Sequence, residues 1–405
     1  MKILMLTAQL GYGGAETSFI RLANYLAQSM DVTVALFTSD YGKGAYALGH
    51  ETLNAKIVLL DSPVRAGRLK RWWQRIKAVR KLKADSDAAI SFLSGPSMVN
   101  VLAGLNSRTV ISLRGSRVYD PVASRPSRLL FQYFLDPIAF WLAARIVPVS
   151  PGLKNEIKQI AGVGVLTKVR AIPPFVEIAS LQHKLSQLAP EPYTQLRGEK
   201  VIVSVGRLSV EKGFHHLIRV FAELTKTEKG IKLLLVGDGP MLSELRHQCI
   251  KRGLAIDDFS PGKTSVLFAG YQKNALPLMA LGKVYAMTSS TEGFPSVMLE
   301  AMAAGVPVIA TDAPWGARAI LSEQAEENSD PYPTSKATES DYGILMPRID
   351  DPGYDREWVR ILSECLRTEK WRELYSQKGK GRLPDYDIER IGQEWKKLID
   401  SLVKK

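Results

Sequence analysis

Short apolar runs alternate with amphipathic stretches over the whole chain. In the first half these runs predict strands at residues 3–8, 32–37, 56–60, 88–92, 109–113 and 145–150. The first run leads into a glycine-rich turn at residues 11–14, and a helical pattern begins at Ala15. Strand, turn, helix and strand in this order are typical of a parallel α/β domain. We expect a doubly wound, Rossmann-like domain over residues 1–177.

A second alternation of the same kind occupies the C-terminal half. Its apolar runs predict strands at residues 201–206, 232–237, 265–270, 284–289 and 307–311. Helical patterns lie at residues 214–226, 240–252, 296–305, 354–380 and 386–403. We expect a second Rossmann-like domain over residues 200–385. A polar linker with a short helix is expected at 178–199, and a polar, acidic loop at 322–341.

No segment is long and apolar enough to predict a membrane-spanning helix. The N-terminal apolar run ends in glycines after about six residues, which is too short for the core of a signal peptide. The longest apolar stretch, Leu129–Val149, contains Asp136, Pro137 and Arg145. We therefore expect a cytoplasmic protein.

Composition and charge narrow the range of functions. The 405 residues include two cysteines, Cys249 and Cys365, without a C-x-x-C motif, and five histidines without metal-ligand spacing. This pattern predicts no metal site. The formal net charge of +13 lies in residues 1–190, which have 24 basic and 11 acidic residues, whereas residues 191–405 have 30 of each. The N-terminal half is expected to face an anionic partner, namely a membrane surface, a nucleic acid or a phosphorylated substrate.

Two cations follow the first predicted strand of the second domain. Arg207 comes directly after Gly206, and Lys212 follows five residues later, ahead of a helix. Cations in this position can bind a diphosphate through charge-assisted hydrogen bonds. The alternative is a solvated basic loop.

Two carboxylates separated by seven residues form a second motif. Glu292 lies in a loop after a strand, and Glu300 lies in an otherwise apolar helix. A buried carboxylate is costly without a partner, which ribose hydroxyls or a basic side chain would supply. The turn at 293–296 offers backbone N–H groups at the start of the helix. A buried structural salt bridge is the alternative for Glu300.

The glycine turn near the N-terminus is a weaker motif. Gly13 and Gly14 allow the backbone to approach an anion at a helix N-terminus. A tight turn that requires glycine for steric reasons is the alternative. The spacing is not that of a dinucleotide fingerprint, and no acidic residue ends the next strand, which disfavours an NAD-dependent oxidoreductase.

Three segments together carry a resemblance to a known family. They are GYGGAE at 11–16, VGRLSVEKGFHHLI at 205–218 with LLLVGDGP at 233–240, and SSTEGFPSVMLEAMAAGVPVIATD at 289–312. The combination resembles the retaining glycosyltransferases of family four, also called group one. This resemblance implies the GT-B fold, with two Rossmann-like domains facing a cleft. It also implies that a C-terminal helix, about residues 386–405, crosses back onto the first domain.

The resemblance further implies roles for individual residues. Arg207 and Lys212 would hold the donor diphosphate, Glu300 the ribose, and Glu292 the donor sugar. The implied donor-binding residues are Gly13, Gly14, Gly206, Arg207, Lys212, Gly237, Gly293, Phe294, Pro295, Ser296 and Glu300. The implied catalytic residues are Glu292, Arg207, Lys212 and Arg114.

Some positions depart from the family pattern. Arg114 stands where many relatives have histidine, and arginine at this position favours N-acetylhexosamine donors. An arginine cannot serve as a general base at neutral pH, so its role would be electrostatic or positional. Ala319 replaces a carboxylate that in relatives contacts the donor sugar, and residues 173–177 read PPFVE in place of PNGVD.

A basic, tryptophan-containing segment is the strongest candidate for the anionic partner. Residues 65–83 contain nine basic residues and no acidic one. Apolar side chains recur there at helical spacing, at Leu69, Trp72, Ile76 and Val79, with Trp73 beside them. Such a helix suits an anionic membrane surface. The alternative is that the stripe packs on the sheet, and nucleic acid is disfavoured because no recognition motif is present. The aromatic stretch Arg125–Trp141 is a second membrane candidate, but its composition favours a buried position.

These observations predict a retaining, metal-independent glycosyltransferase without a cofactor. We expect it to use a nucleotide-sugar donor, UDP-linked by default, and a glycan or polyprenyl-diphosphate-linked acceptor at the cytoplasmic membrane face, in surface polysaccharide biosynthesis. The alternatives are a GDP-mannose-dependent mannosyltransferase and a nucleotide-sugar epimerase or hydrolase on the same fold. A non-catalytic binder is disfavoured because Arg207, Lys212 and Glu292 are all present.

Overall fold

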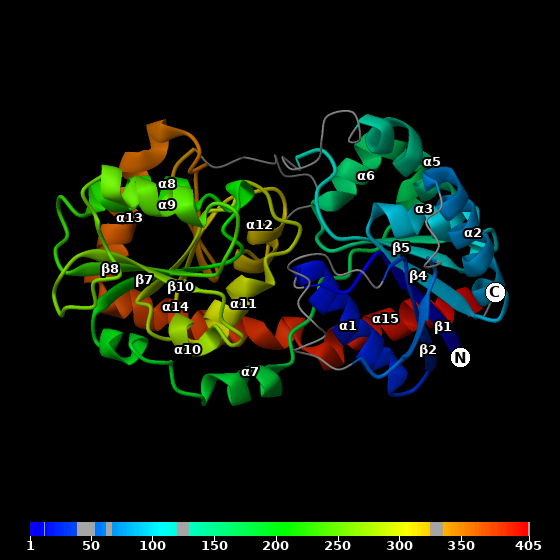
Figure 1. The fold of residues 1–405 in the computed structure, drawn as a ribbon, viewed down its shortest axis with the longest axis horizontal. Coiled ribbons are helices and arrows are strands. Elements are labelled where there is room, and N and C mark those ends of the chain that lie inside the picture. Colours follow the sequence, from blue (N-terminus) through cyan, green and yellow to red (C-terminus); the bar gives the residue numbers. More distant parts are fainter. Residues whose placement is uncertain (12, 39–52, 62–66, 120–128, 325–334, 404–405) are drawn as a thin grey trace. The chain divides into compact units, whose positions relative to one another are not determined.

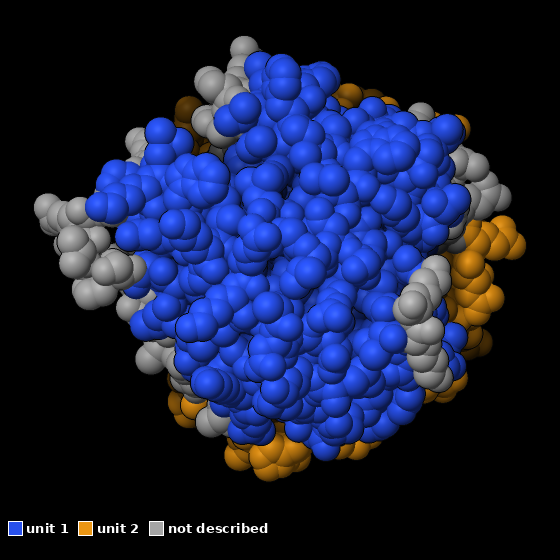
Figure 2. All heavy atoms as spheres, turned by 90° about the vertical axis from the view of Figure 1, so that its right-hand side faces the viewer, with its two compact units in different colours: residues 1–175, 388–405 blue, residues 176–387 orange. Residues whose placement is uncertain are grey.

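The computed structural model describes residues 1–405 except 12, 39–52, 62–66, 120–128, 325–334 and 404–405. The start of the basic segment, the start of the aromatic stretch and half of the acidic loop thus lie outside the described residues. The chain divides into unit 1, residues 1–175 and 388–405, and unit 2, residues 176–387. Figure 2 colours unit 1 blue and unit 2 orange.

Unit 1 is built on a parallel sheet of six strands in its described residues. Their order is β3–β2–β1–β4–β5–β6. The strands are β1 (Lys2–Thr7), β2 (Asp31–Leu36), β3 (Lys56–Leu59), β4 (Ala88–Phe92), β5 (Thr109–Leu113) and β6 (Arg145–Pro148). This order is that of a dinucleotide-binding Rossmann fold.

Helices cover both faces of this sheet (Figure 1). Helices α1 (Gly14–Ala27) and α15 (Ile388–Val403) pack on one face, where Phe19 and Trp395 are buried in the same core. Helices α2 (Arg68–Ala84) and α3 (Ser94–Leu102) pack on the other. The remaining helices are η1 (Asn106–Arg108), the π-helix η2 (Phe131–Leu135), α5 (Asp136–Leu142), α6 (Leu153–Ala161) and η3 (Val163–Lys168). The C-terminal helix therefore belongs to the first unit, as the resemblance implies.

Unit 2 repeats this plan with a larger sheet. The order in its described residues is β13–β14–β12–β11–β7–β8–β10–β9, and β13 is antiparallel to β14. The strands are β7 (Lys200–Val205), β8 (Ile231–Val236), β9 (Ala255–Ile256), β10 (Ser265–Gly270), β11 (Val284–Met287), β12 (Val308–Thr311), β13 (Thr338–Ser340) and β14 (Gly343–Met346). The two parallel, helix-covered sheets confirm the predicted fold class.

Two helical layers also enclose the sheet of unit 2. One consists of α8 (Phe214–Leu224), α9 (Leu242–Lys251) and α13 (Asp355–Arg367). The other contains α7 (Ile178–Leu185), α10 (Leu276–Met279), α11 (Ser296–Ala303) and α12 (Gly316–Leu321). The remaining helices are η4 (Tyr193–Leu196), η5 (Val210–Lys212), η6 (Pro352–Tyr354), α14 (Glu369–Arg382) and η7 (Leu383–Tyr386).

Three features of unit 2 differ from the sequence expectation. Residues 178–199 are not a free linker, because Leu181 and Leu196 are buried in the core of unit 2. The helical pattern at 354–380 is two helices, separated at Thr368, where the backbone is extended. Strand β14 was not predicted, and β13 lies inside the stretch expected to be a loop.

Both sheets reverse their strand order at an equivalent point. In unit 1 the reversal lies between β1 and β4, and in unit 2 it lies between β7 and β11. Ligands of open parallel sheets bind beyond the carboxyl ends of the strands at such a point. Within the described residues, no helix has the length and apolar character needed to cross a membrane.

Candidate active site

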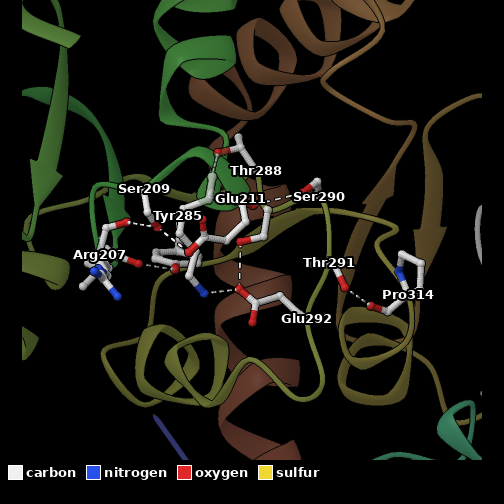
Figure 3. A network of polar contacts seen from close by, with 12 residues as sticks. Arg207, Ser209, Glu211, Tyr285, Thr288, Ser290, Thr291, Glu292 and Pro314 are labelled. Atoms are coloured by element: carbon white, nitrogen blue, oxygen red, sulfur yellow. Dashed lines mark hydrogen bonds and ion pairs between the residues drawn. The ribbon is translucent and has the colours of Figure 1, made fainter. Parts of the chain in front are cut away.

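The candidate residues of unit 2 lie at its topological switch point. Arg207 follows the end of β7, and Glu292 follows the end of β11, the neighbouring strand. The loops after these two strands are joined by hydrogen bonds, which Figure 3 shows from close by. The sequence placed both residues after strands, and the fold brings those strands together.

An ion pair connects the two loops. The Nζ atom of Lys212 lies 2.5 Å from Oε1 of Glu292, and the Ser289 hydroxyl donates to the same oxygen at 2.8 Å. The side chains are partly buried, with 29% of Lys212 and 13% of Glu292 exposed. Oε2 of Glu292 takes part in neither bond, and an ammonium group has two further N–H donors. The pair therefore retains capacity to bind a ligand.

Further hydrogen bonds hold the loop that carries Lys212. The Ser209 hydroxyl donates to Oε1 of Glu211 at 2.5 Å, and the Ser290 amide donates to the Glu211 carbonyl at 2.9 Å. The Thr288 hydroxyl donates to the Lys212 carbonyl at 2.8 Å. Gly213 has φ = +69°, and a Cβ there would lie 2.1 Å from the Thr288 carbonyl oxygen. Glycine is thus required for the two loops to approach each other.

Arg207 differs from Lys212 in having no internal partner. Its side chain is exposed and makes no hydrogen bond or ion pair with other described residues. Gly206 has no steric need for glycine, because the nearest atom to a Cβ is in the Phe214 ring at 3.6 Å. Gly237 does have one, because its Cβ would lie 1.9 Å from the Gly206 carbonyl oxygen. Packing of the chain therefore explains Gly237 but not Gly206.

The turn from Gly293 to Ser296 leads into helix α11. Within the described residues the amides of Gly293 and Phe294 donate no hydrogen bond, whereas the Ser296 amide donates to the Phe294 carbonyl at 3.0 Å. Pro295 precedes the first helical residue, Ser296. Two free N–H groups and a helix N-terminus favour an anionic or hydroxyl-rich ligand. The Phe294 ring packs on Tyr386, with centroids 5.2 Å apart.

Glu300 lies on α11 and is half-buried. The Tyr285 phenol on β11 is completely buried, and burial raises its pKa, with further increases from the charges of Glu292 and Glu300. Glu292 lies in the loop that joins β11, the strand of this phenol, to α11, the helix of Glu300. The structure thus brings Glu292 and Glu300 to one region of unit 2.

The candidate residues of unit 1 form a separate cluster. The Arg114 guanidinium, just after β5, donates to the Ser18 hydroxyl of α1 at 2.5 Å and lies 4.6 Å from the centre of the Phe92 ring. Burial lowers the pKa of Arg114 to about 9, and the charge of Glu16 opposes this shift, so the group stays cationic at neutral pH. The carboxylate of Glu16 points back to Gly13, since Oε2 lies 2.1 Å from where a Cβ of Gly13 would be. At Gly14 a Cβ would meet nothing within 4 Å.

The basic helix α2 has two distinct faces. Its apolar stripe, which includes Trp72, Ile76 and Val79, packs on the sheet. Leu69 and Trp73 are exposed, in contrast to the rest of the stripe. Arg75 forms a two-bond ion pair with Asp61 at 2.6 Å. The buried part of the stripe therefore belongs to the hydrophobic core, and the outer face presents lysine and arginine side chains with Trp73.

Two protein families match this chain. Glycosyltransferase Family 4 matches residues 12–180, and Glycosyl transferases group 1 matches residues 190–328. The chain belongs to the group 1 glycosyltransferases of family four.

This glycosyltransferase has curated relatives of similar length in Campylobacter jejuni. It is 24% identical, over 98% of both chains, to a GalNAc-alpha-(1->4)-GalNAc-alpha-(1->3)-diNAcBac-PP-undecaprenol alpha-1,4-N-acetyl-D-galactosaminyltransferase. It is 28% identical, over 80% of this chain and 78% of the other, to an N-acetylgalactosamine-N,N'-diacetylbacillosaminyl-diphospho-undecaprenol 4-alpha-N-acetylgalactosaminyltransferase.

Among solved structures, Anabaena HepE in complex with UDP and glucose has a TM-score of 0.74 at 22% identity, covering 99% of this chain and 100% of that one. This likeness confirms the GT-B fold.

Several contributors to the glycosyltransferase site were not identified from the sequence. Ser289 stands three residues before Glu292 in a run of polar residues, which was a usable local signal. Tyr285 lies within an apolar strand pattern, and Ser18 is an ordinary residue of an amphipathic helix. No local signal distinguishes these two, because their partners are distant in the sequence. Glu16 belongs to the GYGGAE motif, but the sequence assigned it no role of its own.

Proposed function

We propose that this glycosyltransferase transfers an N-acetylhexosamine, with retention of anomeric configuration, from a UDP-linked donor to a polyprenyl-diphosphate-linked glycan. Transfer takes place at an anionic membrane surface during surface polysaccharide biosynthesis. The observation that carries the donor assignment is the grouping of Arg207, Lys212 and Glu292 at the switch point of unit 2. The acceptor class rests on the two Campylobacter relatives, whose names specify undecaprenol-linked acceptors.

The geometry suits cleavage of a sugar–diphosphate bond. Negative charge develops on the departing diphosphate oxygen, and preorganised cations stabilise it without reorganisation. Arg207 is unpaired within the described residues, and Lys212 is held in place by Glu292. The free amides of Gly293 and Phe294 add donors at the start of α11. Glu292 in turn offers Oε2 to a sugar hydroxyl.

Metal independence is part of this proposal. No group of three or more histidine, cysteine, aspartate or glutamate side chains gathers as a metal site in the described part of the chain. We expect full transfer activity in excess EDTA because two cations take the place of a metal. Loss of activity in EDTA, restored by magnesium or manganese, would contradict this.

A donor screen tests the proposed function directly. The protein is incubated with a synthetic polyprenyl-diphosphate disaccharide and, separately, UDP-N-acetylgalactosamine, UDP-N-acetylglucosamine, UDP-glucose and GDP-mannose. Mass spectrometry of the lipid product should show addition of an N-acetylhexosamine from a UDP donor, and proton NMR should show the α-anomer. Exclusive use of GDP-mannose, or release of free sugar without transfer, would refute the proposal.

A further inference from the structure

An exposed apolar helix face in unit 1 has no partner in the described structure. The π-helix η2 and helix α5 form one continuous helical segment, and its outer side exposes Leu130, Tyr133, Phe134, Ile138, Trp141 and Leu142. Phe134 is 64% exposed and Tyr133 is 63% exposed. We call these six residues the η2–α5 face. The sequence favoured burial of this stretch, and for these residues that expectation is wrong.

The opposite side of the same segment explains the discrepancy. Asp136, Ala139, Phe140 and Ala143 follow a helical spacing and are buried against the unit. Apart from Asp136, the segment is therefore apolar on both sides, a composition that normally signals a helix enclosed on all sides. Here only one side is enclosed. A contiguous apolar patch of this kind on a soluble surface marks a binding surface for another molecule.

The η2–α5 face can be transferred from water to an apolar environment without burying a charged side chain. Between residues 129 and 142 the only acidic or basic residue is Asp136. Its side chain is 6% exposed, faces inward and lies 3.5 Å from the Arg117 guanidinium. The Trp141 indole N–H already donates to the Ala161 carbonyl at 3.1 Å. Desolvation of the face therefore removes mainly hydrocarbon and aromatic surface from water, which is favourable.

Positive charge lies on the same side of the sheet. Helix α5 packs on α3, and α3 packs on α2, so the three helices form one layer (Figure 1). Helix α2 exposes Lys70, Arg71 and Lys77 to solvent. Lys168 lies at the end of the η2–α5 face, where its Nζ donates to the Trp141 carbonyl at 2.6 Å and lies 5.9 Å from the indole ring. This combination complements a surface with anionic headgroups above hydrocarbon.

We propose that the η2–α5 face inserts into the headgroup–acyl boundary of an anionic lipid bilayer. Aromatic side chains beside basic ones are suited to this boundary. The inference deepens the proposed function, on which the choice of a membrane-bound acceptor rests. It assigns hydrophobic insertion to η2–α5 and electrostatic attraction to α2, so the two contributions respond differently to salt.

A fluorescent label at the η2–α5 face provides the test. The two native cysteines, Cys249 and Cys365, are buried, so the substitution Phe134→Cys creates the accessible thiol. An environment-sensitive dye at this position should shift to the blue when vesicles of equal parts phosphatidylglycerol and phosphatidylcholine are added. The matched control is Leu188→Cys, because Leu188 is 75% exposed but lies in unit 2. Its label should not shift. Vesicle binding without a shift at position 134 would overturn the proposal.

A substitution series measures the size of the effect. The double variant Tyr133→Ser/Phe134→Ser should weaken vesicle binding at high salt by about tenfold for each aromatic ring removed. The control Leu188→Ser/Ile250→Ser, at exposed positions of unit 2, should bind as the parent protein does. Circular dichroism shows whether the variants fold. If the double variant does not fold, the fluorescent label at position 134 still tests insertion by itself.

Other occupants of the face give different results. A blue shift without vesicles that grows with protein concentration, together with a doubled mass, would show that a second copy covers the face. Unchanged vesicle binding by the double variant would also overturn the proposal. These assays contain no sugar nucleotide. Failure of sugar transfer with insertion intact would therefore refute the proposed function alone, and the reverse result would refute insertion alone.

Discussion

The two units have the same strand order but differ in where their charged and apolar side chains lie. In unit 2 the switch point combines an ion pair between Lys212 and Glu292 with Arg207, whose side chain has no partner among the described residues. In unit 1 the outer face of α2 carries a cluster of exposed basic side chains, in the same helical layer as an exposed apolar segment.

This difference shows how one topology can support two kinds of recognition. Paired charges at a switch point preorganise a small polar site, which suits a ligand with a defined charge pattern. A broad cationic and apolar surface suits a partner without fixed geometry. The substitutions below test whether the two roles are separate, from the largest expected effect to the smallest.

The first prediction tests whether the Lys212–Glu292 ion pair of unit 2 serves activity or only the stability of the fold. We expect Glu292→Gln to lower kcat by about a thousandfold, because the neutral amide loses the charge–charge attraction that holds Lys212 in place. The melting temperature should fall by less than about 4 °C. Steady-state kinetics and a thermal melt measure both. The control is Asp355→Asn, which removes an Arg219 ion pair of similar burial at 2.7 Å and should leave activity intact.

The outer charge of α2 should act on membrane binding only. The triple change Lys70→Gln, Arg71→Gln and Lys77→Gln should weaken binding to anionic vesicles about a hundredfold at low salt, since each residue contributes roughly 1 kcal/mol. Arg75 is left intact because its ion pair with Asp61 is structural. Co-sedimentation measures the effect, and UDP binding should not change. If the parent protein and the variant pellet equally with anionic vesicles, α2 does not contribute to membrane binding.

Alanine substitutions of Arg207 and Lys212 test the two cations of unit 2 separately. Each alanine substitution should lower kcat/KM for the donor by about 10–100-fold through lost charge-assisted bonds. Arg207→Ala should not change stability, because the side chain has no internal partner in the described structure. Lys212→Ala should destabilise the protein slightly because Glu292 loses its partner. Arg252→Ala, at an exposed position of unit 2, is the control. Unchanged kinetics for both variants would refute the diphosphate assignment.

Glu300 separates ligand binding from structure within α11. We expect Glu300→Gln to weaken UDP binding about tenfold, because an amide accepts weaker hydrogen bonds from ribose hydroxyls than a carboxylate does. Isothermal titration calorimetry gives the affinity, and a melt gives the stability. A large drop in melting temperature with unchanged affinity of the folded fraction would show that Glu300 is structural.

The last prediction concerns the buried lysine of unit 1. Lys83 donates to the Asn100 carbonyl at 2.8 Å, and burial lowers its pKa from 10.5 to about 7. Between these two values the unfolded chain binds more protons than the folded one, so the free energy of unfolding rises with pH. Thermal melts at pH 7 and pH 9 should show this increase, and Lys83→Met should reduce it. In unit 2, burial also lowers the pKa of Lys232, but Asp258 and Glu199 oppose that shift. Lys232→Met should therefore alter the pH dependence less.

Local patterns were sufficient to predict most strands, the glycine turn and the positions of Arg207 and Glu292 after strands of unit 2. Apolar runs of strand length between helical patterns define a parallel sheet, and Arg207 and Glu292 lie in the loops after two such runs. Because loops after parallel strands meet at one edge, their proximity follows from the topology. The roles of Arg207, Lys212 and Glu300 came from a family resemblance rather than from spacing.

These local patterns do not predict contacts between segments that are distant in the sequence. The Lys212–Glu292 pair joins residues 80 positions apart, and Arg114 meets Ser18 across 96 positions. Leu181 is buried although its segment reads as a linker, and Phe134 is exposed although its segment reads as core. Periodicity reports the polarity of each side of a helix. Whether another element covers an apolar side depends on how the chain packs in three dimensions.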